Sequence, residues 1–389
     1  MKLVETHTIR ECHPAFKEID NLCFLSKNLY NSALYEVRQE YIISKKYINW
    51  YEVISRFTKS RQQDYIKLPA KVAQQTIKKV HDAFMSFFAL KKKNILVRIP
   101  KYLDKLGRYP VIYTKQAFSK RDIKKGYIVP SKTNIRIKTK CDPDSIQQVV
   151  IVPKDKLTYV VNVIYEKDEK KLKENNKRYS AIDLGINNLA TLSSNVIKPV
   201  IYNGRPVKAI NQYYNKKISL LYKKYGKSCT TKKLIRLSRK RNNKIKDYLH
   251  KISRMLVNHL VSNDITTLVI GYNKGWKQET NMGCVNNQKF VMIPFCKFVH
   301  MIQYKCILEG ITVILHEESY TSKCSFLDNE SIECHNIYMG KRVHRGLFRS
   351  ASGKYINADL NGSLNIMKKV IGEFKYPIEV CSTPLKISS

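Results

Sequence analysis

Two aspartates stand where carboxylate chemistry would be expected. Asp183 follows the apolar pair Ala181-Ile182, and Asp359 lies in the segment Asn357-Ala358-Asp359-Leu360-Asn361. A carboxylate among apolar strand residues is costly unless it binds something. Oxygen ligands are those that Mg²⁺ prefers, and two such ions can drive in-line attack on a phosphodiester. The ordinary alternatives are a turn-forming acid near Gly185 and a first-turn acid favoured by the helix dipole at 359.

The elements around both aspartates follow the order of an RNase H-like nuclease fold. The apolar spacings predict strands at 179–184, 188–194 and 198–202, a basic helical stretch at about 209–261 interrupted near 226–230, a strand at 267–270, a helix at 293–309, a strand at 311–315 and a helix at 357–370. An irregular loop is expected at about 320–355. In that fold, carboxylates at the ends of the central strands hold divalent cations, so both aspartates would meet at one place.

Two segments of different character precede this region. Residues 1–94 are predicted to be helical, with apolar stripes at 16–41 and 70–88. Residues 95–178 contain short β-rich runs, which favour a small barrel or antiparallel sheet, and end in a charged linker at 167–178. The expected fold class is therefore α/β and multi-domain, with the nuclease domain at 179–389.

Charge and composition restrict the partners and the compartment. The 389-residue chain has 71 Lys and Arg against 31 Asp and Glu, and its net charge of +40 favours a polyanion such as nucleic acid. An apolar content of 43% excludes a disordered chain, and no uncharged apolar run approaches the roughly 20 residues of a membrane span. Ten cysteines without a C-x-x-C pair indicate a reducing intracellular compartment, which is the nucleus if the host is eukaryotic and otherwise the cytoplasm.

Six short motifs, in this order and spacing, resemble one nuclease family. They are Leu29-Tyr30-Asn31, Leu68-Pro69-Ala70, Phe118-Ser119-Lys120, Asp183 in its strand, Thr321-Ser322-Lys323-Cys324 and Asn357-Ala358-Asp359-Leu360-Asn361. The chain resembles TnpB proteins and their eukaryotic and viral relatives, Fanzor, which carry a split RuvC-like nuclease. The resemblance implies an RNA-guided DNA endonuclease of a mobile element, with guide RNA and double-stranded target DNA as partners and two Mg²⁺ ions as cofactor. It also implies a recognition region with flanking wedge elements in 1–94, a wedge-type barrel in 95–178, and reading of a short motif beside the target.

The chain departs from the common family pattern at the third catalytic acid. Many members end the strand before the second motif in a glutamate, where this chain has Gly271. A subset with the same Ile-Gly-x-Asn-Lys tract resembles this chain and uses a glutamate after the following strand, which corresponds to Glu317 or Glu318. That strand would lie one position beyond the strand of Gly271, two spacings of about 4.8 Å from Asp183. Glycine would leave this gap open. The prediction is Glu318, three residues before the Thr-Ser-Lys tract, with Glu317 as the alternative.

Cysteines and histidines near the last motif form an incomplete zinc pattern. Relatives often place two C-x-x-C pairs there, whereas this chain has the single cysteines Cys324 and Cys334, with His335 and His344 nearby. This spacing fits no common zinc finger. We expect a degenerate loop without zinc, with a Cys₂His₂ site as the alternative.

Basic and aromatic residues near the expected site are candidates for nucleic-acid contacts. The stretch 216–251 is rich in Lys and Arg with few acids, which favours a surface for phosphates over a solvated helix face. Tyr272, Trp276 and Lys277 follow Gly271 and could stack on bases or bind phosphate, although core packing is an equal interpretation for Trp276.

A second basic tract precedes Asp359. Arg342, Arg345 and Arg349 could guide a DNA strand into the site, because arginine can bind phosphate oxygens bidentately.

Two other functions stay open on the sequence. One is a catalytically inactive RNA-guided DNA-binding protein, in which Gly271 marks a dead site. The other is a DNA strand transferase of a mobile element, which shares the RNase H-like fold and joins 3′ ends to new DNA.

Overall fold

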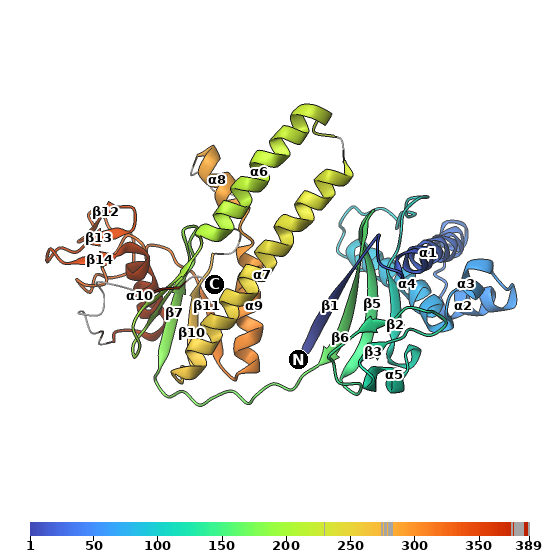
Figure 1. Ribbon diagram of the computed structural model, residues 1–389, viewed down its shortest axis with the longest axis horizontal. Coiled ribbons are helices and arrows are strands. Elements are labelled where there is room, and N and C mark those ends of the chain that lie inside the picture. The colour runs from blue at the N-terminus through green and yellow to red at the C-terminus, as the bar shows by residue number, and fades with distance from the viewer. Residues whose placement is uncertain are drawn as a thin grey trace. The chain divides into compact units, whose positions relative to one another are not determined.

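The described chain folds as two compact units. The computed structural model describes residues 1–228, 230–273, 275, 278, 283–374, 376 and 385–387. Unit 1 is Met1–Lys167 and unit 2 is Asp168–Ser389. The division falls at the start of the charged run 167–178 (Figure 1).

A four-stranded antiparallel sheet organises unit 1. Its order is β1 (Lys2–Arg10), β6 (Thr158–Glu166), β5 (Ile146–Asp155) and β2 (Val111–Thr114). β1 pairs with β6 along its whole length, from Lys2 opposite Glu166 to Arg10 opposite Thr158. Within the segment predicted to be mainly helical, Lys2–Arg10 instead form β1, an edge strand whose side chains alternate between more and less exposed positions.

Helices pack on this sheet in one shared core. α1 (Phe16–Ser44) and α4 (Ala70–Lys92) confirm the two predicted helical stripes, and α2 (Trp50–Lys59) and α3 (Gln63–Lys67) connect them. Fully buried Leu34, Phe84 and Val149 show that helices and sheet share the core. The short elements η1 (Lys115–Ala117), α5 (Lys120–Lys124), β3 (Tyr127–Ile128) and β4 (Ile137–Lys138) complete the unit.

Unit 2 is built on a six-stranded mixed sheet. Its order is β11 (Thr312–His316), β10 (Thr267–Gly271), β7 (Tyr179–Asp183), β8 (Asn188–Ser194), β9 (Val200–Asn203) and β15 (Leu385–Ile387). β7, β8 and β9 are antiparallel, whereas β10 is parallel to both β7 and β11. This confirms the predicted position of the strand before Glu317 and Glu318, one place beyond the strand that ends at Gly271.

Helices cover both faces of this sheet. On one face, Ile182 and Ile270 pack in a core with α7 (Lys232–Ser262) and α9 (Phe295–Leu308). On the other face, Ala181 and Val269 pack against α10 (Ala358–Ile371). Figure 1 shows α10 on one side of β7 and β10 and the other two helices on the opposite side. The strands are therefore buried on both sides.

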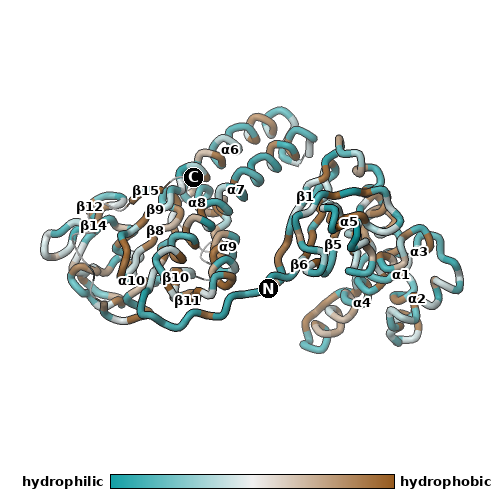
Figure 2. Tube along the Cα trace, turned by 60° about the horizontal axis from the view of Figure 1, so that its bottom comes forward, coloured by the Kyte–Doolittle hydropathy of each residue, from teal (hydrophilic) through white to brown (hydrophobic). Residues whose placement is uncertain are grey.

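The basic insertion is a helical hairpin. α6 (Arg205–Tyr225) and α7 enclose the predicted interruption at 226–230. Figure 2 shows mainly hydrophilic residues toward the hairpin tip and hydrophobic residues along β10 and α10. Only the base of the hairpin packs into the core.

Several elements were not predicted. The expected loop at 320–355 contains β12 (Lys341–His344), β13 (Leu347–Arg349) and the start of β14 (Tyr355–Asn357), so the prediction of an irregular loop is wrong there. These short strands carry few buried side chains and left no apolar period to read. α8 (Cys284–Val291) precedes α9. The stretch Cys284–Leu308 is long and apolar enough to cross a membrane by composition, but Pro294 divides it and α9 packs in the core.

Candidate active site

Asp183 ends β7 and faces α10. Side chains alternate along a strand, so Asp183 points to the same side of the sheet as Ala181, which packs against α10. Gly362 of α10 lies opposite, and a Cβ at that position would be 3.1 Å from Asp183 Oδ2. The carboxylate fits against the helix because residue 362 has no side chain.

Glu318 approaches the same side of the sheet from the edge strand. It follows β11 by two residues, and its Oε2 atom lies 2.8 Å from where a Cβ on Gly271 would be. The Glu318 N–H donates to Asn273 Oδ1 at 3.0 Å, and Asn273 Nδ2 donates to Glu318 Oε1 at 3.5 Å. Gly271 thus leaves the space that the Glu318 side chain occupies, and Asn273 holds it there.

Glu317 points elsewhere. Its side chain is exposed, and the Ser319 hydroxyl donates to its Oε1 atom. Lys369 Nζ donates to the Glu317 carbonyl at 3.2 Å, which fixes the backbone of this turn. Of the two adjacent glutamates, Glu318 is the one placed beside Gly271 and Asp183.

Asp359 occupies the first turn of α10. Asn357 caps the helix by accepting from the Asp359 and Leu360 amides. Asn188, at the start of β8, donates to Asp359 Oδ2 at 2.7 Å, and Arg342 of β12 approaches Oδ1 at 3.3 Å. Two elements distant in sequence therefore fix this carboxylate.

The buried polar face of α10 holds the three acidic segments together. Ser363 donates to the Ala181 carbonyl at 2.9 Å, two residues before Asp183. Asn365 donates to the Thr321 carbonyl at 2.9 Å, and Thr321 in turn donates through its hydroxyl to the Glu318 carbonyl at 2.8 Å. α10, which carries Asp359, thus bonds directly to the strand of Asp183 and, through Thr321, to the backbone of Glu318.

The acids influence one another electrostatically. Burial raises the pKa of Asp183 well above its usual value, and the nearby carboxylates of Glu318 and Asp359 raise it further, while Arg342 opposes the shift. Burial alone raises the pKa of Glu318 to about 7. Groups that resist ionisation in this way are stabilised by a bound cation, so the shifts mark a place where positive charge is favoured.

The residues present fit a hard divalent cation. All donors are oxygens, and Glu318 Oε2 is buried without a hydrogen-bond partner among the described residues. Across those residues, no three His, Cys, Asp or Glu side chains are close enough to hold one metal ion together. The three acids are therefore neighbours whose side chains would have to move to share an ion.

A cavity of about 220 Å³ opens beside Asp359. It is lined by the 185–188 turn, Asp359 and three arginines, Arg205, Arg342 and Arg345. Cations around an acidic centre can hold a phosphate close to it without neutralising the acids fully. The cavity is thus suited to a phosphodiester next to the carboxylates.

Sequence comparisons match the chain to two family models and to a viral protein. Residues 162–277 match the family model for a probable transposase, OrfB_IS605, and residues 295–366 match the model for the TNB domain of Cas12f1-like proteins. The TnpB-like protein ORF457 of Acidianus two-tailed virus is 24% identical over 96% of this chain and 89% of its own length. These matches support a TnpB-type chain.

More distant similarities accompany these matches. The CRISPR-associated endodeoxyribonuclease Cas12f2 of a Micrarchaeota archaeon is 29% identical over 56% of this chain and 41% of its own length. A solved Cas12f1-sgRNA-target DNA complex matches 94% of this chain and 98% of that one, with 14% identity and a TM-score of 0.39. The mini-RNA-guided endonuclease CRISPR-Cas_phi3 matches 97% and 94%, with 11% identity and a TM-score of 0.45.

The four zinc candidates do not gather at one point. Cys324 is fully buried and its thiol donates to the Glu333 carbonyl at 3.7 Å. Cys334 and His344 are exposed, and His335 contacts the Ser331 carbonyl at 2.8 Å. Within the described ranges, none of them belongs to a metal-binding group of three.

The structure distributes the remaining candidates among different roles. Trp276 and Lys277 lie outside the described residues. Tyr272 packs against the core of unit 2, and its hydroxyl lies 3.4 Å from Cys296 Sγ. Arg349 is exposed and stacks over the Tyr355 ring, away from the cavity that Arg342 and Arg345 line.

Sequence reasoning missed the residues that position the acids. Asn188, Asn273 and Gly362 each contact a candidate ligand. Asn188 begins the strand that pairs with β7, and Gly362 follows Asp359 by three residues, so proximity in sequence was the available signal. Their contacts depend on the packing of α10 and could not be read from spacing alone.

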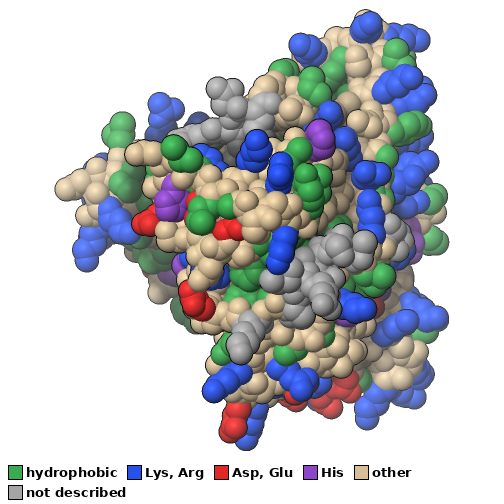
Figure 3. All heavy atoms as spheres, turned by 90° about the vertical axis from the view of Figure 1, so that its left-hand side faces the viewer, with side chains coloured by type: hydrophobic (Ala, Val, Ile, Leu, Met, Phe, Trp, Pro, Cys, Tyr) green, Lys and Arg blue, Asp and Glu red, His purple; other side chains and the backbone are tan. Residues whose placement is uncertain are grey.

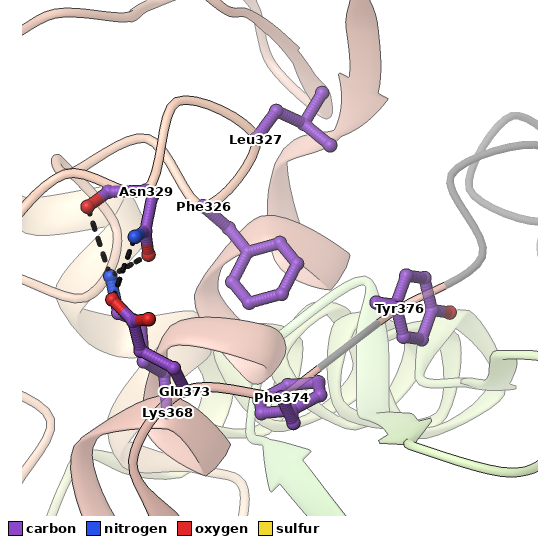
Figure 4. A pocket seen from close by; sticks show the side chains of 7 residues that line it. All are labelled: Phe326, Leu327, Asn329, Lys368, Glu373, Phe374 and Tyr376. Atoms are coloured by element: carbon purple, nitrogen blue, oxygen red, sulfur yellow. Dashed lines mark hydrogen bonds between the residues drawn. The ribbon is translucent and has the colours of Figure 1, made fainter.

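A second hollow lies at the other end of α10. Figure 4 shows this pocket, of about 340 Å³, where Phe326, Phe374 and Tyr376 face Asn329, Lys368 and Glu373. Lys368 donates to the Asn329 side chain at 2.5 Å, and Asn329 donates to Glu373 at 2.7 Å. Its polar groups thus bond to one another, and the acidic centre lies at the opposite end of the helix.

Proposed function

We propose that this chain is an RNA-guided DNA endonuclease of a mobile element that cuts target DNA beside a short flanking motif by hydrolysis with two Mg²⁺ ions. The similarity to TnpB proteins and to the endodeoxyribonuclease Cas12f2 supports nuclease activity. The net charge of +40 supports guide RNA and double-stranded DNA as partners. The β9-β8-β7-β10-β11 strand order supports an RNase H-like, RuvC-like unit 2.

The arrangement around Asp183 is the observation that carries the proposal. Its carboxylate is buried between the charges of Glu318 and Asp359, although each comes from a different element. Such a cluster destabilises the fold unless a cation compensates it. An inactive binding protein would have no use for retaining all three acids in this arrangement.

The residues at the site have three different roles in the proposed function. Asp183, Glu318 and Asp359 would hold Mg²⁺, which when bound supplies activation of water and stabilisation of the leaving oxygen. Arg205, Arg342 and Arg345 line the adjacent cavity and would bind the phosphate to be cut. Asn188 and Asn273 orient Asp359 and Glu318 through their amides.

Cleavage by purified protein and its co-purified RNA tests this function. RNA sequencing should yield an abundant discrete species, and Mg²⁺ should permit cutting of DNA that matches it. Asp183→Ala, Asp359→Ala and Glu318→Ala should each lower cleavage by more than about 100-fold while RNA-dependent DNA binding persists. The matched control Glu317→Ala should retain activity.

Other experimental outcomes would support the two alternative functions. Specific RNA-dependent DNA binding without cleavage in the unaltered chain would establish an inactive binder. Joined rather than cut products would establish a strand transferase. A random mixture of co-purifying RNA would contradict guided recognition.

A further inference from the structure

A pocket between α6 and α7 has the chemistry of a nucleotide site. It measures about 230 Å³ and is lined mainly by Ile210, Tyr213, Tyr214, Lys240, Arg241 and Lys244. We propose that it binds one unstacked nucleotide of a single-stranded nucleic acid, with the base between the helices and the phosphate on the cationic rim. The proposal rests on the proposed function only in taking nucleic acid as the ligand, and it requires no cleavage.

Helical spacing brings the lining residues together. On α6, Tyr213 and Tyr214 follow Ile210 by three and four residues. On α7, Lys240 and Arg241 follow Leu237 by three and four residues, and Lys244 follows Lys240 by four. Each helix therefore gives one face to the pocket, with apolar and aromatic side chains from α6 and mostly cations from α7.

The two tyrosines differ in how firmly their rings are held. Tyr214 is fixed, because its hydroxyl lies 3.0 Å from Ser238 Oγ and the Arg241 guanidinium stacks over its ring at 5.6 Å. Tyr213 is 59% exposed, and the Lys217 ammonium lies 5.7 Å from the centre of its ring. A fixed ring with an apolar floor and an exposed ring beside it can accommodate a flat base, because every base has a face that stacks on aromatic rings.

The cations are also of two kinds. Arg241 is held in place, since Nε donates to Asn211 Oδ1 at 2.8 Å and Nη2 donates to the Met292 carbonyl at 2.8 Å. Lys240 and Lys244 are exposed and make no hydrogen bond or ion pair within the described chain. They stand four residues apart on one face, where a single phosphate could contact both.

The positive charge around the pocket favours a nucleotide over other ligands. The lining contains no acid, and α6 and α7 together carry sixteen Lys and Arg but one acid, Asp247, which pairs with Lys251 at 2.9 Å. In Figure 3 the hairpin rises at the top, and its visible surface carries Lys and Arg without Asp or Glu. A cationic or purely apolar ligand would leave this charge unbalanced, whereas a nucleotide supplies both an anion and a flat apolar face.

Photocrosslinking of the full chain tests the site. Single-stranded RNA and DNA oligonucleotides that carry 5-iodouracil would be bound in EDTA, irradiated, and the crosslinked peptide mapped by mass spectrometry. We expect crosslinks at Tyr213 or Tyr214 with at least one probe, and the reactive probe identifies the strand. Tyr213→Ala should lower the crosslink yield in this pocket and weaken binding about tenfold, as expected for one lost base–aromatic stack, and Tyr213→Phe should restore the affinity.

Matched variants outside the pocket separate this site from general charge. Tyr225→Ala removes another exposed tyrosine of α6, and Lys223→Ala removes an exposed lysine of the same helix. Both should keep the crosslink, whereas Lys240→Ala with Lys244→Ala should reduce it. Crosslinks confined to other peptides, or unchanged in Tyr213→Ala, would overturn the proposal. Because Asp183→Ala should crosslink like the unaltered chain, failure of this site and failure of cleavage are distinguishable.

Discussion

Two residues without side chains shape the acidic centre. Gly271 ends the strand between those that lead to Asp183 and Glu318, and its Cβ would lie 2.8 Å from Glu318 Oε2. Gly362 gives Asp183 the same freedom on α10. The glycine at 271 and the position of Glu318 are therefore linked physically, because the Glu318 side chain fills space that a side chain at 271 would need.

Gly271→Ala tests this relation. The new Cβ would meet Ile366 Cδ1 at 2.5 Å and Glu318 Oε2 at 2.8 Å, so both must shift. We expect cleavage to fall at least about tenfold and the free energy of unfolding to fall by about 1–3 kcal/mol, as for other overpacked cores. Cleavage assays and denaturant unfolding measure the two effects.

A second substitution separates the two contacts. Ile366→Val removes Cδ1 and with it the closest clash, but leaves Glu318 displaced. The double variant Gly271→Ala with Ile366→Val should regain stability and stay poorly active. Full recovery of cleavage would mean that Glu318 is not a ligand at this position.

At the scale of elements, helix α9 buries a lysine that has no acidic partner among the described residues. Lys305 is 3% exposed, and its Nζ donates to the His250 carbonyl at 2.9 Å and to Ser253 Oγ at 2.6 Å, both on α7. Burial lowers the pKa of Lys305 to about 8. The contacts join two core helices, but the ammonium is costly to bury.

Lys305→Met should change how stability depends on pH. Between pH 8 and its ordinary pKa of 10.5, Lys305 binds fewer protons in the folded than in the unfolded chain, so the free energy of unfolding should rise over this window. The rise should total about 3 kcal/mol and vanish in Lys305→Met, as measured by denaturant unfolding at intervals from pH 7 to 10.5. The exposed Lys297→Met of the same helix is the control and should keep the slope; a slope retained in Lys305→Met would contradict the argument.

How far the sequence predicts these elements depends on how each is buried. α1, α4 and α10 carry long apolar stripes and were predicted within a few residues. β1 and β12 lie at sheet edges and were missed: the less exposed positions of β1 include Glu5 and His7, so its sequence shows no apolar alternation, and every residue of β12 is exposed. Helix α8, with Phe290 as its buried residue, was also missed.

For the candidate site, the sequence predicted the acidic residues but not the residues that position them. Asp183, Asp359 and Glu318 came from motifs and strand order, and the structure places them as electrostatic neighbours. Asn188, which donates to Asp359 across 171 positions of sequence, came from neither. Such second contacts depend on how α10 packs over the sheet, which no local pattern encodes.

At the scale of the whole molecule, the two units hold separate cores. The core of unit 1 runs from Ile9 to Val163 and contains no residue beyond Lys167. The two cores of unit 2 begin at Ala181 and Ile182. A unit with a complete core of its own can fold as an independent domain.

A fragment of residues 1–167 should therefore fold by itself. Its two ends are joined in the structure, since β1 pairs with β6 and the Met1 ammonium donates to the Lys167 carbonyl at 2.8 Å. We expect one cooperative thermal transition by circular dichroism. A fragment of residues 11–167 lacks β1, which removes the contacts of buried Ile9 and nine ladder positions. That loss should cost at least about 3 kcal/mol. Non-cooperative melting of the longer fragment would show that unit 1 depends on the rest of the chain. Equal stability of the two fragments would show that β1 does not stabilise unit 1.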